Sequence, residues 1–197
     1  MKNITVSILI LAFAVAAGAQ TMNTAETSGK GKIGGFVSTN ALILRDFTTA
    51  NYSFAFATYG ITNRIDAYAG ASTTTLLGQT QVSVGGGANV NVIKTKLVSV
   101  SNYFIISAPL TRRADGCGLV VFNSVIVSKN LGKVTPYSGW SATVPLGNTQ
   151  NKLFTGASTA YNVPVGVMIP KGKFAYFAEY NFGHTVQAVG VGVAFTP

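Results

Sequence analysis

Charged residues are scarce in this chain of 197 residues. They make up 10% of it, with 14 Lys and Arg against 5 Asp and Glu, whereas about 25% is usual for soluble domains. Hydrophobic residues make up 48%. This composition argues against a typical cytosolic globular protein, although the length is sufficient for one domain with a sizeable core.

Cysteine and histidine each occur once, as Cys117 and His184. A single cysteine excludes an intramolecular disulfide, and one residue of each type excludes a metal site with several Cys or His ligands. His184 has no acid or nucleophile beside it in the sequence, and His184 with Asp115 does not make a catalytic site. Gly85-Gly86-Gly87 lacks the Lys-Ser/Thr of a phosphate loop. We therefore expect no enzymatic activity and no cofactor.

Long apolar runs are absent beyond the N-terminus. Residues 4–16 are apolar, and Ala17-Gly18-Ala19 gives the small-residue pattern of a cleavage site. The run is too short for a membrane helix, which needs ~20 residues. We therefore expect residues 1–19 to be a cleaved signal peptide for export. Because no later segment is long enough for such a helix, entry into a membrane would require a closed β-barrel.

The pattern that is present has a period of two, most clearly in residues 173–195. One face of its first half consists of Phe174, Tyr176, Ala178, Tyr180 and Phe182, and the other face is small or weakly polar. After a turn at 183–184, valines and Phe195 alternate with glycines and alanines. Two alternating segments joined by a tight turn predict a β-hairpin. An apolar face opposite a small one is typical of a strand between lipid and a narrow interior.

Similar segments recur along the chain after residues 20–32, which are rich in Thr, Ser and Gly and which we expect to be a flexible leader. Ten strands are expected, at 35–44, 52–59, 65–72, 82–92, 98–110, 119–128, 134–144 and 159–169 and in the hairpin. Most approach the ~9–11 residues of a tilted membrane strand. The sequence predicts an all-β fold in which residues 33–197 form a single antiparallel up-and-down transmembrane β-barrel. The strand count is about ten, or eight if the first pair lies outside the barrel.

The connections between these segments alternate in length. The even-numbered ones are tight, at 60–64, 93–97, 129–133 and 170–172. The first, third, fifth and seventh are longer, at 45–51, 73–81, 111–118 and 145–158, while the ninth is short. A barrel with both termini in the periplasm has short turns at one end and longer loops at the other.

Two segments resemble bacterial outer-membrane β-barrel proteins, a superfamily that includes opacity porins and OmpA- and OmpX-like barrels. Residues 59–68, Tyr-Gly-Ile-Thr-Asn-Arg-Ile-Asp-Ala-Tyr, resemble the strand–turn–strand unit of such barrels. Residues 189–195, Val-Gly-Val-Gly-Val-Ala-Phe, resemble the terminal strand through which the outer-membrane assembly machinery recognises them. The family ends on the aromatic residue, whereas Thr196 and Pro197 follow Phe195 here. The resemblance implies insertion into the outer membrane but identifies no subfamily.

Candidate site residues fall into two groups. Phe174, Tyr176, Tyr180, Phe182, Trp140 and Tyr161 are candidates for an aromatic belt at the membrane interface. Asp66 and Glu179 lie on predicted inward faces, and because buried carboxylates need partners, Arg45 and Arg64 are candidates to pair with them. These four lumen charges either set the ion preference of a pore or fill a small barrel as a salt-bridge plug. The plug interpretation is preferred because narrow barrels are largely filled by side chains.

Most other cations lie in or beside the tight turns. They either form an electropositive rim for anionic lipid or lipopolysaccharide or, as we prefer, cap strand ends where they stay hydrated. Nucleic-acid binding is not expected, because no recognition-helix or basic–aromatic motif is present.

These observations predict a bacterial outer-membrane barrel with a structural, surface-interaction or narrow passive-pore role. Its partners would be membrane lipid and the assembly machinery. The alternative is a secreted or surface β-sandwich that acts as an adhesin or self-associates. That fold requires a charged, solvated second face on each strand. A third hypothesis, a barrel enzyme, requires clustered acids and His.

Overall fold

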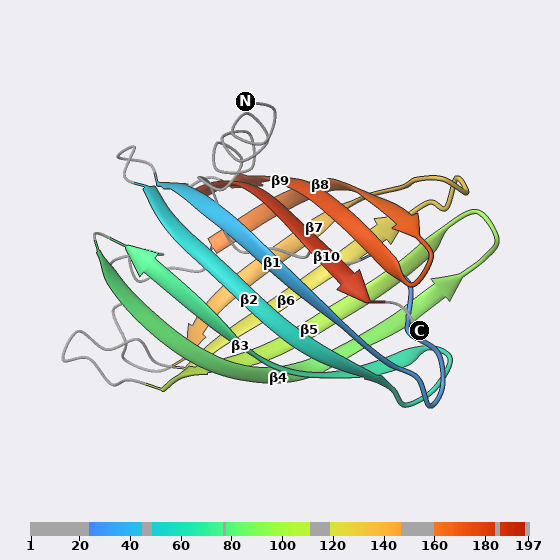
Figure 1. Ribbon diagram of the computed structural model, residues 1–197, viewed down its shortest axis with the longest axis horizontal. Coiled ribbons are helices and arrows are strands. Elements are labelled where there is room, and N and C mark those ends of the chain that lie inside the picture. Colours follow the sequence, from blue (N-terminus) through green and yellow to red (C-terminus); the bar gives the residue numbers. More distant parts are fainter. Residues whose placement is uncertain are drawn as a thin grey trace, which may run out of the picture.

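The computed structural model describes residues 24–44, 49–76, 78–110, 119–146, 160–183 and 186–195, which form a closed antiparallel β-barrel (Figure 1). Its strands are β1 (Ile33–Leu44), β2 (Thr49–Gly60), β3 (Ile65–Leu76), β4 (Gln79–Lys94), β5 (Ser99–Pro109), β6 (Leu119–Ser128), β7 (Thr135–Leu146), β8 (Ala160–Lys171), β9 (Phe174–Gly183) and β10 (Val186–Phe195). In these ranges no helix is long and apolar enough to span a membrane. The predicted all-β barrel of ten strands is confirmed.

Each strand pairs with its neighbours in sequence, and β1 closes the barrel by pairing with β10. Phe36 on β1 lies opposite Phe56 on β2 and opposite Ala194 on β10. The register shifts once, between Asn91 and Ile93 where β4 meets β5. The first pair of strands therefore belongs to the barrel, and the version with eight strands is wrong.

The connections at one end of the barrel, 61–64, 95–98, 129–134 and 172–173, are tight, as predicted. We call this the short-turn end. At the other end the predicted long loop at 73–81 is wrong, because β3 runs to Leu76 and β4 begins at Gln79. Gly78 has φ +76°, and the Thr75 and Thr80 hydroxyl groups hydrogen-bond at 2.9 Å. The polar composition suggested a loop, but the β-branched threonines favour strand.

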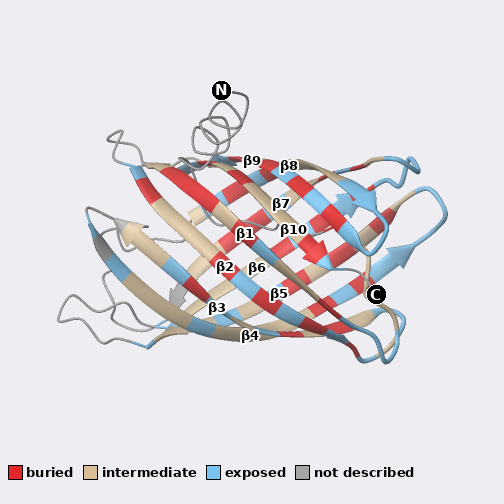
Figure 2. Cartoon of the chain, viewed as in Figure 1, coloured by how far each residue is buried: buried red, intermediate tan, exposed pale blue. Residues whose placement is uncertain are grey.

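Side chains alternate between the two faces of the barrel wall, which gives the banding of buried and exposed residues in Figure 2. The core lies inside the barrel, where aromatic rings from several strands meet. The rings of Phe36 and Phe56 stack with centroids 5.7 Å apart, and those of Tyr68 and Tyr103 stack at 5.9 Å. The middle of the barrel is therefore packed with side chains, as expected for a narrow barrel. The inward core consists of Phe54, Phe56, Tyr68, Tyr103, Ile126, Tyr137, Ala175, Phe177 and Ala194, with Phe36, Tyr52, Ile105 and Met168 packed against it.

The segment just before β1 differs from its prediction. Residues 20–32 were expected to be a flexible leader, but residues 24–31 lie against the interior of the short-turn end, and Ala25 belongs to the core cluster. We call residues 24–31 the strap. Residues 20–23 and the predicted signal peptide, residues 1–19, lie outside the described residues.

Candidate functional site: the outer face, the basic rim and the strap

The outer face of the barrel is apolar over most of its height. The outward positions of β8, β9 and β10 are almost entirely valine, isoleucine, alanine or aromatic, and many of their large side chains are exposed. The charged outward residue in these strands is Lys171, at the short-turn end of β8. Such a surface is costly to expose to water, because burying apolar surface yields about 25 cal/mol per Å².

Several polar side chains on the outer face are paired with one another or with backbone. Asn102 on β5 and Asn123 on β6 exchange two amide hydrogen bonds, at 3.3 and 3.2 Å. On β1 and β2 the hydroxyl groups of Thr39 and Ser53 are 3.0 Å apart, and on β7 Ser138 donates to the Pro164 carbonyl at 2.9 Å. Because lipid offers no hydrogen-bond partners, such pairing lets polar residues face it.

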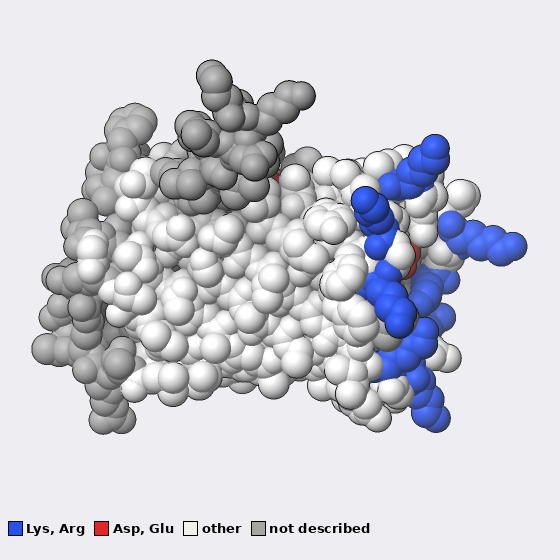
Figure 3. Space-filling model, in the orientation of Figure 1, with Lys and Arg blue, Asp and Glu red and all other residues white. Residues whose placement is uncertain are grey.

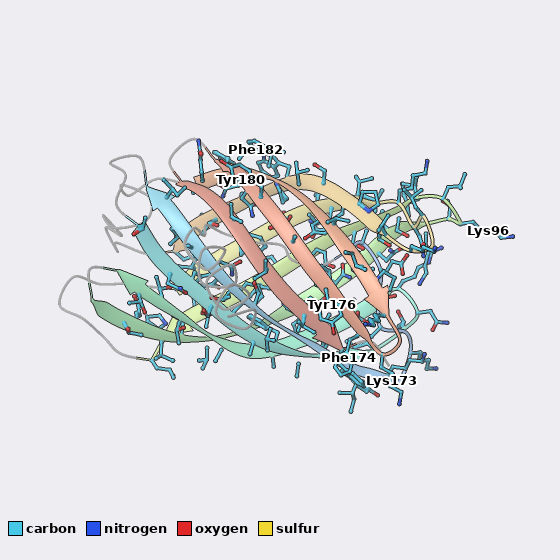
Figure 4. The ribbon with its side chains drawn as sticks, turned by 45° about the horizontal axis from the view of Figure 1, so that its top comes forward. Lys96, Lys173, Phe174, Tyr176, Tyr180 and Phe182 are labelled. Atoms are coloured by element: carbon cyan, nitrogen blue, oxygen red, sulfur yellow. The ribbon has the colours of Figure 1, made fainter. Side chains whose placement is uncertain are left out.

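The predicted belt residues point outward. Phe174, Tyr176, Phe182, Trp140 and Tyr161 are between 46% and 56% exposed, and Tyr180 is half-buried. In Figure 4 Phe174 and Tyr176 lie toward the short-turn end of β9, and Tyr180 and Phe182 toward its other end.

These aromatic residues also contact neighbours on the outer face. The Phe174 ring lies 6.0 Å from that of Phe195, and Trp140 stacks on Tyr161 at 5.4 Å. The outward aromatic residues of β9 form two groups, one on each side of Ala178. Transmembrane barrels carry aromatic girdles at both interfaces of an apolar band.

Exposed cations gather at the short-turn end, where Figure 3 shows a cap of blue side chains, while most of the other described surface in that view is white. No Asp or Glu of the described ranges is exposed. The fully exposed charges of this end are therefore all positive, while Glu26 of the strap is half-buried there. We call this group the basic rim, and its members are Lys30, Lys32, Arg64, Lys94, Lys96, Lys129, Lys133, Lys171 and Lys173.

The four predicted lumen charges do not come together. Asp66 and Glu179 are buried in the interior, at 2% and 3% exposure. Arg64 is exposed in the β2–β3 turn and belongs to the basic rim, so its placement in the lumen is wrong. The turn lets its long side chain stay hydrated. Arg45 lies outside the described residues.

Hydrogen bonds from uncharged groups stabilise the two acids. The carboxylate of Asp66 accepts from the Ser28 backbone N–H of the strap at 2.8 Å. The carboxylate of Glu179 accepts from the Asn181 amide at 2.6 Å. Hydrogen bonds to ionised groups are stronger than neutral ones.

The strap is held by polar residues that sequence analysis did not single out. Ser101 donates to the Ala25 carbonyl at 2.6 Å, and Asn91 donates to the same oxygen. Tyr103 donates to the Thr24 carbonyl, and the Ala25 N–H donates to Ser128 at 3.2 Å. The signal in the sequence was the placement of Asn and Ser, which have hydrogen-bonding side chains, on inward faces of β4–β6.

The residues weighed as catalytic candidates, Cys117, Asp115 and His184, lie outside the described residues. Within the described ranges no three His, Cys, Asp or Glu side chains gather in a way that would hold a metal ion. The expectation of a chain without enzymatic activity stays a prediction.

No family model matches this chain, and no curated protein matches it in sequence. Several solved barrels are similar in chain path. A KdgM porin in complex with disordered oligogalacturonate aligns with a TM-score of 0.46 and 10% identity, over 84% of this chain and 99% of that one. The translocator domain of autotransporter NalP from Neisseria meningitidis aligns at 0.43 and 11%, over 85% and 88%. A de novo designed transmembrane β-barrel aligns at 0.37 and 14%, over 86% and 98%.

These likenesses extend to β-barrel architecture, which the strand pairing of this chain establishes by itself. They do not reach the finer resemblance to opacity porins and OmpA- or OmpX-like barrels, which stays a prediction.

Proposed function

We propose that this chain is an outer-membrane β-barrel protein of a diderm bacterium, exported through a signal peptide at residues 1–19. The observation that carries the proposal is the outer face, which is apolar, bears its aromatic residues on β9 in two groups and pairs several of its polar side chains. A closed barrel with such a face meets both requirements of lipid, a satisfied backbone and an apolar exterior. The alternating Val189–Phe195 strand would serve recognition by the assembly machinery.

The sandwich alternative is not favoured. It needs a second sheet packed against the first, whereas all ten strands here form one closed ring. It also needs a solvated, charged face, and the described charges are confined to the short-turn end and the interior.

The interior supports a structural or surface-interaction role over free diffusion of solutes. Aromatic rings fill the middle of the barrel, and the strap covers its short-turn end. A pore for polar solutes requires a continuous hydrated passage, such as the water-filled interior of porins. We infer that the folded protein is closed to ions in its resting state.

The test is conductance of the refolded mature protein, residues 20–197, in planar lipid bilayers. The expected result is no discrete current steps in 1 M KCl. Faster migration of unboiled than of boiled protein in detergent gels, together with recovery from the outer-membrane fraction, verifies the folded barrel. Regular current steps from heat-modifiable protein would support the narrow-pore role. Soluble protein without a mobility shift would contradict the membrane proposal.

The basic rim supports a second part of the proposal, contact with anionic lipid headgroups. A lysine or arginine near an anionic membrane surface contributes about 1 kcal/mol. Changing Lys94, Lys96, Lys129 and Lys133 to glutamine is expected to slow folding into vesicles with 30% phosphatidylglycerol while leaving folding into pure phosphatidylcholine unchanged. The measurement is the rate of the gel-mobility shift at low and high salt. Equal rates for variant and parent in anionic vesicles would favour the simple strand-capping role.

A further inference from the structure

The strap crosses the short-turn end from one wall of the barrel to the opposite wall. It leaves β1, and the Gly31 N–H donates to the Gly60 carbonyl of β2 at 2.7 Å. It then passes Asp66 on β3 and reaches Ser128 on β6. In a ring of ten strands β1 and β6 lie opposite each other. Eight residues therefore span the mouth of the barrel.

The wall contacts the strap mainly through the backbone of the strap. Side chains of Asn91, Ser101 and Tyr103 donate to its carbonyl oxygens, and Ser128 accepts from its N–H. On the side of the mouth closer to β1, the Asp66 carboxylate accepts from the Ser28 N–H at 2.8 Å. Asn89 on β4 also donates to the Glu26 carbonyl, at 3.5 Å. Six side chains from four strands thus replace the pairing that a neighbouring strand would supply.

The place where Ala25 sits accepts only a small side chain. Ala25 is 0% exposed and belongs to the same core cluster as Phe54, Tyr68 and Tyr103. Its Cβ packs against the aromatic interior while its N–H and carbonyl are both bound by the wall. A large residue here would displace neighbours, which densely packed interiors resist.

We propose that the short-turn mouth is a peptide-binding site, occupied in cis by residues 24–28 of the mature N-terminus. Its ligand class is an extended chain segment, recognised through its backbone and a small residue at the Ala25 position. The occupied site seals the interior, so any molecule entering from this end must first displace the strap. The proposal rests on the closed barrel of the proposed function.

The test measures whether a cysteine at position 25 is protected in the full mature chain. In a Cys117→Ser background, Ala25→Cys and Lys30→Cys place the same reporter at a buried and at an exposed position of one segment. In folded, heat-modifiable protein the Ala25→Cys thiol is expected to react with a maleimide at least about 100-fold more slowly than the Lys30→Cys thiol, because reaction requires release of the strap. Similar rates would overturn the proposal.

A second comparison asks whether the named wall residues bind the strap. Adding Asn91→Leu and Ser101→Ala removes both donors to the Ala25 carbonyl and is expected to accelerate labelling of the Ala25→Cys thiol by about tenfold or more. The matched control is Asn162→Leu with Ser141→Ala. That Asn/Ser pair is also inward and buried but lies on β7 and β8, away from the strap. Unchanged labelling in the first pair, or equal acceleration in both, would overturn the assignment of the site.

Gly60→Ala provides an independent change to the same site. A Cβ at Gly60 would overlap the Gly29 carbonyl oxygen of the strap. It is expected to accelerate labelling of the Ala25→Cys thiol, while boiled and unboiled samples still differ in mobility. Loss of the mobility shift in the parent protein would instead refute the proposed membrane barrel, so failures of the two proposals are distinguishable.

Discussion

Replacing Ala178 with arginine is expected to destabilise the protein in lipid vesicles by about 2–4 kcal/mol, the usual cost of a cation at the midplane of a transmembrane barrel. Ala178 points outward on β9, midway between Phe174 and Phe182, and lies opposite Val167 on β8 and Val191 on β10. If lipid surrounds this face, the guanidinium must be buried in hydrocarbon or must distort the bilayer to reach water. The measurement is the free energy of unfolding from urea titrations in vesicles.

Leu97→Arg is the matched control for this change. Leu97 is also an exposed apolar residue, but it lies in the 95–98 turn at the basic rim, where an added arginine stays hydrated. Its expected effect is within about 0.5 kcal/mol, as for ordinary surface changes. Equal, small effects at both positions would show that water and not lipid meets the outer face, and would contradict the proposed location.

Replacing Gly87 with alanine is the second change with a large expected effect. Gly87 lies on the inward face of β4, where an added Cβ would overlap the Phe104 carbonyl oxygen and lie 2.8 Å from Ile105 Cα. These are backbone atoms of β5, so the two paired strands would have to separate to relieve the contact. Overpacking of this kind typically costs about 1–3 kcal/mol and occasionally more.

The adjacent Gly86 supplies the comparison for this variant. An added Cβ there meets only the Tyr68 carbonyl oxygen, at 3.1 Å, on the outward face. Gly86→Ala is expected to change the free energy of unfolding by less than half as much as Gly87→Ala. The reverse order would show that β4 and β5 are not as close as described.

The outer wall of the barrel was the part most readily predicted from sequence. Alternation in 174–182 and 189–195 placed Phe174, Tyr176 and Phe182 on one face, and the structure shows them exposed. The same alternation placed Asp66 and Glu179 inside. These features can be predicted because successive side chains of a strand point to opposite faces, so a two-residue period in the sequence assigns each residue to the inside or the outside.

The partners of the inward acids did not follow from sequence. Asp66 is bound by the Ser28 N–H and not by Arg64, although Arg64 is closer in sequence. The prediction matched the acids with basic side chains and did not consider backbone N–H groups as hydrogen-bond donors. The basic side chain stays in water, which avoids the cost of burying a second ion.

The strap was missed for a related reason. Its composition, rich in Thr, Ser and Gly, is that of a flexible segment, and its contacts are distant, since Ala25 and Ser128 are 103 residues apart. No local sequence pattern predicts a contact between residues so far apart. The connection between β3 and β4 shows the opposite error. The threonines near Thr75 were predicted to form a loop, but they continue strand β3.

The position of the strap also bears on the order of assembly. Its described hydrogen-bond partners on the wall lie on β2–β6 and in the turn before β3, all within the chain up to Ser128. Closure of the ring requires Gly35 to meet Phe195, at nearly the full length of the chain. Distant pairings form slowly. A chain delivered from its N-terminus therefore contains all the described hydrogen-bond partners of the strap before β10 arrives to close the ring, although the core cluster that holds Ala25 is completed only by later strands.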